Sequence, residues 1–262
     1  MDSSVNHGKN LAMAFLFGGT FALIGQIILS LVAPISGPAF AGPITLLCFG
    51  VIALVMYIPG IHHKLAPLAG FGLILPFNGF ASGIADAFQA GYLPKKDFSS
   101  GLRSALKLFF IVIGIGGLID FLAGVFGFYV SLPQITPPEA LTGVAALIGA
   151  FLVGGGLCVV FQLFLEFTKV PVPVLLVCGL ALGGICTLFG LTDILASLGG
   201  GGFTILVVGA GQAVTLTTML LMQGQPMMLL LVLSIFVTLF VVGIICALGN
   251  AALKPSDNTK TA

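Results

Sequence analysis

The phrase AFLFGGTFALIGQ, from Ala14 to Gln26, returns in the second half of the chain as AFLVGGGLCVVFQ, from Ala150 to Gln162. Both copies are apolar, carry adjacent glycines near their middle and end on glutamine. One polypeptide that contains the same phrase twice is expected to have two corresponding halves. The repeat therefore guides the interpretation of the rest of the sequence.

The repetition extends into two glycine-rich stretches. GIHHKLAPLAGFGLILPFNG, from Gly60, aligns without gaps on GLTDILASLGGGGFTILVVG, from Gly190. The positions that agree are Gly60/Gly190, Leu65/Leu195, Ala66/Ala196, Leu68/Leu198, Gly70/Gly200, Gly72/Gly202 and Gly79/Gly209. Glycine and proline disfavour continuous helix, so these two stretches are predicted to be broken segments.

The composition predicts a membrane protein. Apolar residues make up 58% of the 262 residues and charged residues 6%, against roughly 25% charged in an ordinary soluble domain. So few charges cannot cover a soluble globule of this length. Apolar runs long enough to cross a bilayer are predicted near residues 11–33, 43–60, 105–129, 143–166, 173–190 and 226–249.

The distribution of Lys and Arg distinguishes two topologies. If the broken stretches also crossed, giving eight crossings and parallel repeats, the basic residues would be divided four against five between the two sides. If each broken stretch is a re-entrant hairpin, all nine fall on one side, namely Lys9, Lys64, Lys95, Lys96, Arg103, Lys107, Lys169, Lys254 and Lys260. The positive-inside rule favours the second topology, with both termini cytoplasmic.

We therefore expect an all-α integral membrane protein of two repeats, each with three transmembrane helices and one glycine-rich re-entrant hairpin. The repeats would span residues 11–129 and 143–250, between short polar tails at 1–10 and 251–262. Three crossings per repeat invert the second repeat relative to the first, as in many secondary transporters. The two hairpins would then enter from opposite faces and meet near the midplane.

A solute path is predicted along these hairpins, because broken helices at membrane depth offer free backbone groups. The alternative is that their small residues only permit close helix packing. The residues assigned to the path are Gly70, Gly72, Pro76, Asn78, Gly79, Gly200, Gly202 and Gly209, together with Asp120, Gln26 and Gln162.

Asp120 lies near the middle of its predicted helix, where an acidic side chain is costly. It could bind a cation, relay a proton or be a packing residue, and the second repeat has no acidic counterpart. Gln26 and Gln162 could pin each first helix to its hairpin or face the path, with pinning slightly favoured. Asp86, Glu166 and Asp193 lie near helix ends and are expected to be solvated caps.

Catalytic and cofactor signatures are absent from the sequence. It contains no G-x-S-x-G, H-E-x-x-H or P-loop motif, and adjacent His62 and His63 do not share a helix face. We expect no enzyme activity, no metal site, no cofactor and no nucleic-acid partner.

Three segments in order resemble the stage V sporulation protein A (SpoVA) membrane proteins, particularly their AC and AE members. They are AFLFGGTFALIGQ, LAGFGLILPFNGFASGIADA and GLRSALKLFFIVIGIGGLI, all within residues 11–120. The family is known as single-repeat proteins, so this chain departs by carrying two copies. Its second copy also has Leu206 where Pro76 stands and Val208 where Asn78 stands.

The resemblance implies passage of a small organic acid such as dipicolinic acid, with calcium, across a bacterial cytoplasmic membrane or spore inner membrane. It also implies that other SpoVA-type subunits, or further copies of this chain, are partners besides the lipid bilayer and the solute. The alternative function is a structural subunit of a sporulation membrane complex that transports nothing.

Overall fold

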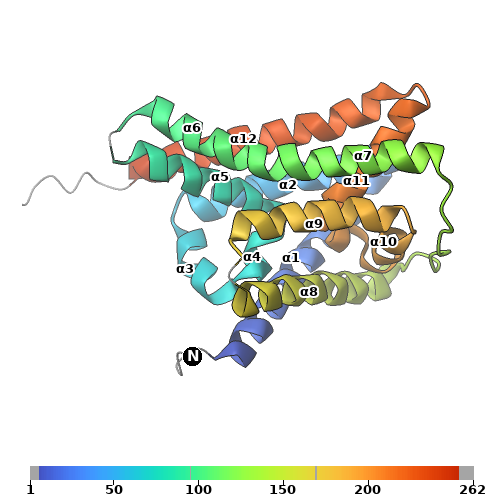
Figure 1. Ribbon diagram of the computed structural model, residues 1–262. Helices are drawn as coiled ribbons and strands as arrows, with labels where there is room; N and C mark the ends of the chain where they lie inside the picture. The colour runs from blue at the N-terminus through green and yellow to red at the C-terminus, as the bar shows by residue number, and fades with distance from the viewer. Residues whose placement is uncertain (1–5, 95, 169, 254–262) are drawn as a thin grey trace, which may run out of the picture.

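The computed structural model describes residues 6–94, 96–168 and 170–253, which are largely helical (Figure 1). The helices of the first half are α1 His7–Ser36, α2 Pro38–Tyr57, α3 Ile61–Ala69, α4 Phe71–Ile74, α5 Phe77–Tyr92, α6 Phe98–Phe109, the π-helical η1 Phe110–Gly116 and α7 Gly117–Tyr129. Those of the second half are α8 Gly143–Phe167, α9 Val172–Thr187, α10 Leu191–Thr204, α11 Val207–Met222 and α12 Pro226–Leu253.

The prediction of an all-α membrane protein is confirmed. Within the described residues, five helical spans are long and apolar enough to cross a bilayer: α1, α2, the continuous α6–η1–α7, α8 and α12. α9 and α10 are long and apolar enough only when taken together, and they meet at an angle of 115°, the bend at which α9 ends and the second glycine-rich stretch begins. The third crossing begins at Phe98 rather than near residue 105, because Asp97 caps α6 by accepting from the N–H groups of Ser99 and Ser100.

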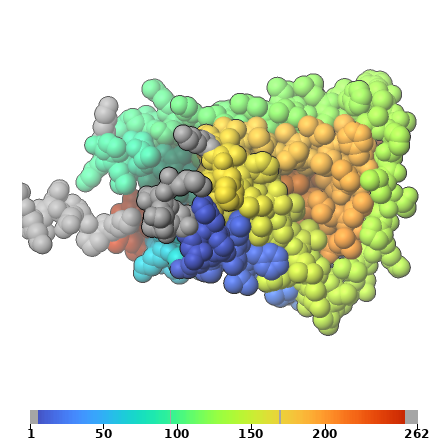
Figure 2. All heavy atoms as spheres, turned by 60° about the horizontal axis from the view of Figure 1, so that its bottom comes forward, coloured from blue at the N-terminus to red at the C-terminus, as the bar shows by residue number. Residues whose placement is uncertain are grey.

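Corresponding helices of the two halves run in opposite directions, as an inverted repeat requires. α1 and α8 pack against each other and point opposite ways along the bundle (Figure 1). α1 begins at the end of the bundle where α12 finishes, and residues 130–142 cover the opposite end (Figures 1 and 2). We call these the terminal end and the loop end.

Each glycine-rich stretch enters and leaves the bundle at one end, so the eight-crossing alternative is wrong. At the terminal end, Tyr57 before the first hairpin donates its hydroxyl to Asp86 on the returning α5, at 2.7 Å. At the loop end, Leu188 before the second hairpin and Met219 on the returning α11 both lie against Gly127 of α7. The hairpins therefore enter from opposite ends.

The tips of the hairpins cross in the middle of the bundle. Phe77 N–H donates to the carbonyl of Ile205 at 3.0 Å, and Val207 N–H donates to the carbonyl of Leu75 at 3.2 Å. These reciprocal bonds form an antiparallel bridge around Pro76 and Leu206. Proline fits there because the bridge does not use the N–H of that position.

The basic residues that the structure describes agree with the predicted charge distribution. Lys9, Lys64 and Arg103 lie on helices that meet at the terminal end, Lys96 lies in the turn between α5 and α6, and Lys107 lies farther along α6. Lys95, Lys169, Lys254 and Lys260 lie outside the described residues, as do the predicted tails at residues 1–5 and 254–262.

Candidate functional site

Gly70 and Gly200 break the two hairpins in the same way. Their backbone angles are φ 50°, ψ −130° and φ 47°, ψ −128°, a region that residues with a Cβ rarely enter. A Cβ at either position would also overlap the side-chain oxygen of a glutamine, Gln162 at Gly70 and Gln26 at Gly200. Glycine is therefore required at both breaks.

Gln26 and Gln162 cap the helices that follow these breaks. Gln162 Oε1 accepts from the N–H of Phe71 at 2.9 Å, and Gln26 Oε1 accepts from the N–H of Gly201 at 2.7 Å. Each glutamine is buried and satisfies a backbone donor that a helix start leaves free. The glutamines thus connect the first helix of each half to a hairpin, as expected, but each one bonds to the hairpin of the other half and not to its own. A role for them in the solute path stays a prediction.

The other predicted glycines allow close packing. A Cβ at Gly72 would lie 2.5 Å from the carbonyl of Ala14 in α1, and one at Gly202 would lie 2.8 Å from Ala150 in α8. Gly79 and Gly209 lie against backbone carbonyls at the end of the preceding helix of their own hairpin, α4 and α10, where a side chain would collide. These residues hold each hairpin against its neighbours.

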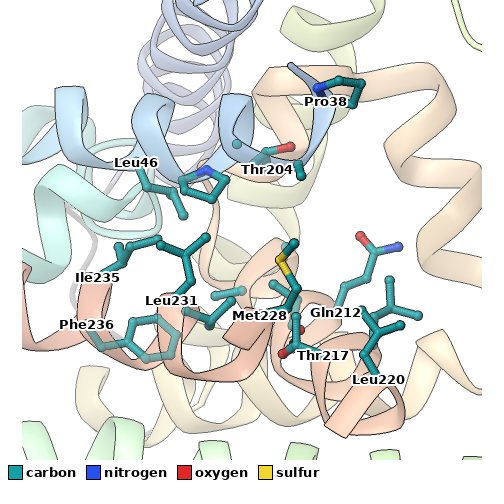
Figure 3. A pocket seen from close by; sticks show the side chains of 18 residues that line it. Pro38, Leu46, Thr204, Gln212, Thr217, Leu220, Met228, Leu231, Ile235 and Phe236 are labelled. Atoms are coloured by element: carbon teal, nitrogen blue, oxygen red, sulfur yellow. Dashed lines mark hydrogen bonds between the residues drawn. The ribbon is translucent and has the colours of Figure 1, made fainter. Parts of the chain in front are cut away.

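A sizeable cavity lies beside the second hairpin. It has a volume of about 450 Å³ and is lined by the first half of α2, by Thr204 at the end of α10, by α11 and by the first half of α12 (Figure 3). It extends from Pro38 and Leu220, near the turns at the loop end, to Gly209 and Ala210 in the first turn of α11. Gly209 is the predicted path residue that lines it.

The cavity has an apolar wall and a few polar groups. Leu46, Ile235 and Phe236 form one side, whereas Gln212 and Thr217 lie on the other (Figure 3). A volume of this size with few polar groups is typical of small-molecule sites. The Gln, Thr and Ala residues of α11 were not singled out from the sequence. The recurrence of Gln and Thr within this otherwise apolar segment is the sequence signal that could have identified them.

The hydrogen bonds of the lining leave mainly acceptors for a ligand. Gln212 donates from Nε2 to Asp193 Oδ1 at 2.7 Å, and Thr217 and Thr204 donate their hydroxyls to backbone carbonyls of their own helices. No basic side chain lines the cavity. Asp193, expected to be a solvated cap, is instead bonded to the returning helix of its hairpin.

The equivalent space beside the first hairpin is filled. Phe80 occupies the position that Ala210 has in the second hairpin, and it is 2% exposed. Its ring centroid lies 6.4 Å from that of Phe109 and 6.2 Å from that of Phe77. The two halves therefore differ where a ligand could bind.

Two polar path candidates are completely buried away from the cavity lining. Asn78, at the start of α5, and Asp120, in α7, are both 0% exposed. Neither side chain has a hydrogen-bond partner among the described residues. The structure does not bring these two residues and the glutamines together into one polar site.

The acidic residues of the terminal end are bonded rather than free. Asp86 accepts from Tyr57 and also contacts His63 Nε2 at 3.2 Å. Glu166, whose side chain is 7% exposed, accepts from Gln162 and pairs with His7, so the expectation of a solvated cap is wrong for it. Within the described residues, no group of three His, Cys, Asp or Glu side chains could hold a metal ion.

Comparison with known proteins finds a match for the first half. Residues 10–125 match the model of the SpoVAC/SpoVAEB sporulation membrane protein family, a segment that runs from α1 into α7. No curated protein and no solved structure matches the chain. The relation of the second half to the first rests on the internal alignment and on the shared hairpin geometry.

The long apolar helices indicate a multi-pass membrane protein, and the match relates its first half to a family of sporulation membrane proteins. Over residues 10–125 the chain resembles the SpoVAC/SpoVAEB sporulation membrane proteins, and the expected resemblance to the SpoVA family is thereby confirmed.

Proposed function

We propose that this protein passes a small organic acid, such as dipicolinic acid together with calcium, across a bacterial membrane. The observation that carries the proposal is the cavity of about 450 Å³ that runs from the loop end to the tip of the second hairpin. Hairpins that meet at membrane depth from opposite ends are typical of transporters and channels. The family resemblance supports the choice of solute.

The route would be closed in the described conformation. Leu75, Phe77, Ile205 and Leu206 at the crossing are at most 1% exposed, so the cavity ends at a packed barrier. The tips are joined by two backbone hydrogen bonds and by apolar contacts. Separation of the two tips is the step that would connect the cavity to the terminal end.

The basic residues support an orientation. Lys9, Lys64, Lys96 and Arg103 belong to the terminal end, which the positive-inside rule assigns to the cytoplasm. The cavity would then face the opposite side of the cytoplasmic membrane, or of the spore inner membrane. Both described chain ends would be cytoplasmic.

The lining supports an uncharged form of the solute. A dicarboxylate would meet oxygen acceptors and apolar carbon without a basic partner, which is unfavourable. The same acid chelated by calcium, or protonated, would bring no net charge. Weak binding of such a species suits a channel or a low-affinity carrier.

The test is solute entry into vesicles that contain only the purified chain. Vesicles loaded with Tb³⁺ would report entry of dipicolinate by luminescence. Ala210→Phe inserts the ring that fills the equivalent space in the first half, and we expect entry at least about tenfold slower. Val237→Phe, at a position on α12 that is 55% exposed, is the matched control and should leave entry unchanged.

Two outcomes would overturn the proposal. In the first, dipicolinate enters vesicles with the wild-type chain no faster than protein-free vesicles; in the second, it enters Ala210→Phe vesicles as fast as wild-type vesicles. The first outcome would favour the alternative function, a structural subunit. That alternative predicts association with other SpoVA-type subunits or with further copies of this chain, measurable by co-purification from membranes.

A further inference from the structure

Asp120 occupies an unusual position in the membrane part of the fold. It lies in the first turn of α7 and is fully buried. Neither carboxylate oxygen has a hydrogen-bond partner among the described residues. The hydroxyl of Thr215, on α11, donates to the backbone carbonyl of Asp120 at 3.1 Å and does not contact the carboxyl group through a hydrogen bond.

The junction around Asp120 is closely packed. A Cβ at Gly184 of α9 would overlap Asp120 Oδ1 and would lie 2.6 Å from Thr215 Oγ1. One turn along α7, a Cβ at Gly124 would lie 2.6 Å from the carbonyl of Thr215. Two glycines therefore bring α7, α9 and α11 together around one carboxyl group, which leaves little room for a hydrated ion.

No charged group faces Asp120 from the elements packed against it. α7 packs on α9, α11 and η1. Neither α11 nor η1 has a titratable residue, and the titratable groups of α9 are the thiols of Cys178 and Cys186. Along the continuous α6–η1–α7 span, the nearest charged residue is Lys107 in α6, thirteen residues away, about 20 Å at 1.5 Å per residue. A buried carboxylate without a counter-charge is strongly disfavoured, so the neutral acid fits this site best.

α11 separates Asp120 from the cavity. Gly209, Ala213 and Leu216 lie on the face that lines the cavity. Gly211 and Thr215 lie on the opposite face, against α9 and α7. A displacement of α11 at Asp120 would therefore move the wall of the cavity.

Two further features favour a mobile, protonatable junction. The π-helical η1 ends four residues before Asp120, and π-helical turns are frequent at functional sites. A second, more polar cavity of about 340 Å³ at the loop end is lined by Gly127 and Met219, two turns from Asp120. Water in that cavity could accept the proton once it leaves the junction. In the second half, α12 is a continuous α-helix without a π-helical turn and without an acid.

We propose that Asp120 is a proton-binding site, occupied in this conformation, and that release of its proton to water at the loop end displaces α11 from α7 and α9. The O–H bond of the acid breaks, the proton passes to water, and the remaining carboxylate becomes hydrated as α11 moves. The ligand is a proton, and the moving part is the wall of the cavity. The consequence for solute passage rests on the function proposed above, whereas proton binding does not.

Infrared spectroscopy of the whole purified chain tests proton binding directly. The carboxylic-acid C=O band should be present at neutral pH, should disappear as the pH is raised, and should be missing in Asp120→Asn. Asp193→Asn, which removes the carboxylate bonded to Gln212, is the matched control and should keep the band. Absence of the band in wild type at neutral pH, or its persistence in Asp120→Asn, would overturn the proposal.

Thiol labelling tests the displacement. With the native cysteines replaced by alanine, Met219→Cys places a thiol at the end of α11, beside the polar cavity. Its labelling rate, relative to the same chain carrying Asp120→Asn, should rise several-fold as the infrared band disappears. An equal rate in both backgrounds at every pH would refute the coupling, whatever the vesicles show about flux. If flux occurs, Asp120→Asn should make it independent of pH over the same range.

Discussion

The two hairpins have the same backbone and different side chains. Gly70 and Gly200 differ by 3° in φ and 2° in ψ (50° against 47°, −130° against −128°), and each break is capped by a glutamine from the opposite half. The positions that follow differ: Phe80 fills the space beside the first hairpin, whereas Ala210 leaves a cavity beside the second. The shared glycine breaks and glutamine caps place the tips of the two hairpins against each other. The difference between Phe80 and Ala210 leaves a cavity beside the second hairpin and none at the equivalent place beside the first.

A comparison of the break points should show the largest effect. Gly70→Ala and Gly200→Ala each force a Cβ into a forbidden backbone region and onto a glutamine oxygen, so we expect loss of folded protein in both cases. Folding is measured as the yield of a single species in size-exclusion chromatography. Gly156→Ala, in α8 with nothing within 4 Å, is the control and should fold normally. If Gly70→Ala folded and Gly200→Ala did not, the two hairpins would not depend in the same way on their glycine breaks.

Phe80, which fills the space beside the first hairpin, should contribute to stability as a core residue does. Phe80→Ala would open beside the first hairpin the cavity that Ala210 leaves in the second, at a cost of about 3–5 kcal/mol. The measurement is the free energy of unfolding in detergent micelles. Phe164→Ala, at a position that is 52% exposed on α8, is the control and should cost much less. A loss below about 1 kcal/mol would mean that Phe80 does not carry the packing of the first half.

Much of the fold was predictable from the sequence because it depends on local chemistry. Gly70 and Gly200 could be identified as breaks since glycine and proline interrupt helices, and the distribution of Lys and Arg favoured re-entrant hairpins. The glutamines could be identified as a pair, but not their partners, because each contact joins residues more than 90 positions apart.

The cavity and the packing around Asp120 were less accessible. The cavity depends on the volume of Ala210 relative to Phe80, which matters only when α2 and α12 are placed beside α11. The close approach of Gly184 in α9 to the carboxyl group of Asp120 in α7 likewise depends on tertiary contacts. The π-helical η1 has no established sequence signal of its own, and apolar residues of this kind ordinarily predict continuous α-helix.

The two glutamine caps should have similar effects. Gln26→Leu and Gln162→Leu each leave a buried backbone N–H without its acceptor, and we expect each to lower the free energy of unfolding by about 1–3 kcal/mol. Thermal unfolding of both variants side by side is the measurement. Gln26→Glu keeps an acceptor oxygen and should be less harmful than Gln26→Leu. Unequal losses of unfolding free energy in the two leucine variants would show that the two glutamine caps do not contribute equally to stability.

Asn78 should give an effect of the opposite sign. Its counterpart in the second hairpin is Val208, and its own amide is buried without a partner. Asn78→Val should therefore stabilise the fold by about 1–2 kcal/mol. Asn250→Val is the control and should destabilise, because Asn250 donates to the carbonyls of Tyr57 and Ile58. Destabilisation by Asn78→Val would indicate that a buried water satisfies the amide.

The smallest expected effect concerns acid stability. Burial lowers the pKa of His62, Asp86 raises it and His63 lowers it, with burial the largest influence. The counterpart of His62 is Thr192, a buried residue whose hydroxyl bonds Thr187 at 2.9 Å and does not titrate in this range.

The sign of the effect follows from linkage. In the unfolded chain His62 takes up a proton below about pH 6.5, whereas in the fold it does so only at lower pH, so stability is lost as the pH falls through 6.5. His62→Thr should therefore lose less stability than wild type between about pH 7.5 and pH 5. Comparing this loss within each protein cancels any packing difference that the substitution causes at neutral pH. An equal loss in both proteins would show that burial of His62 does not cause the acid sensitivity of the fold.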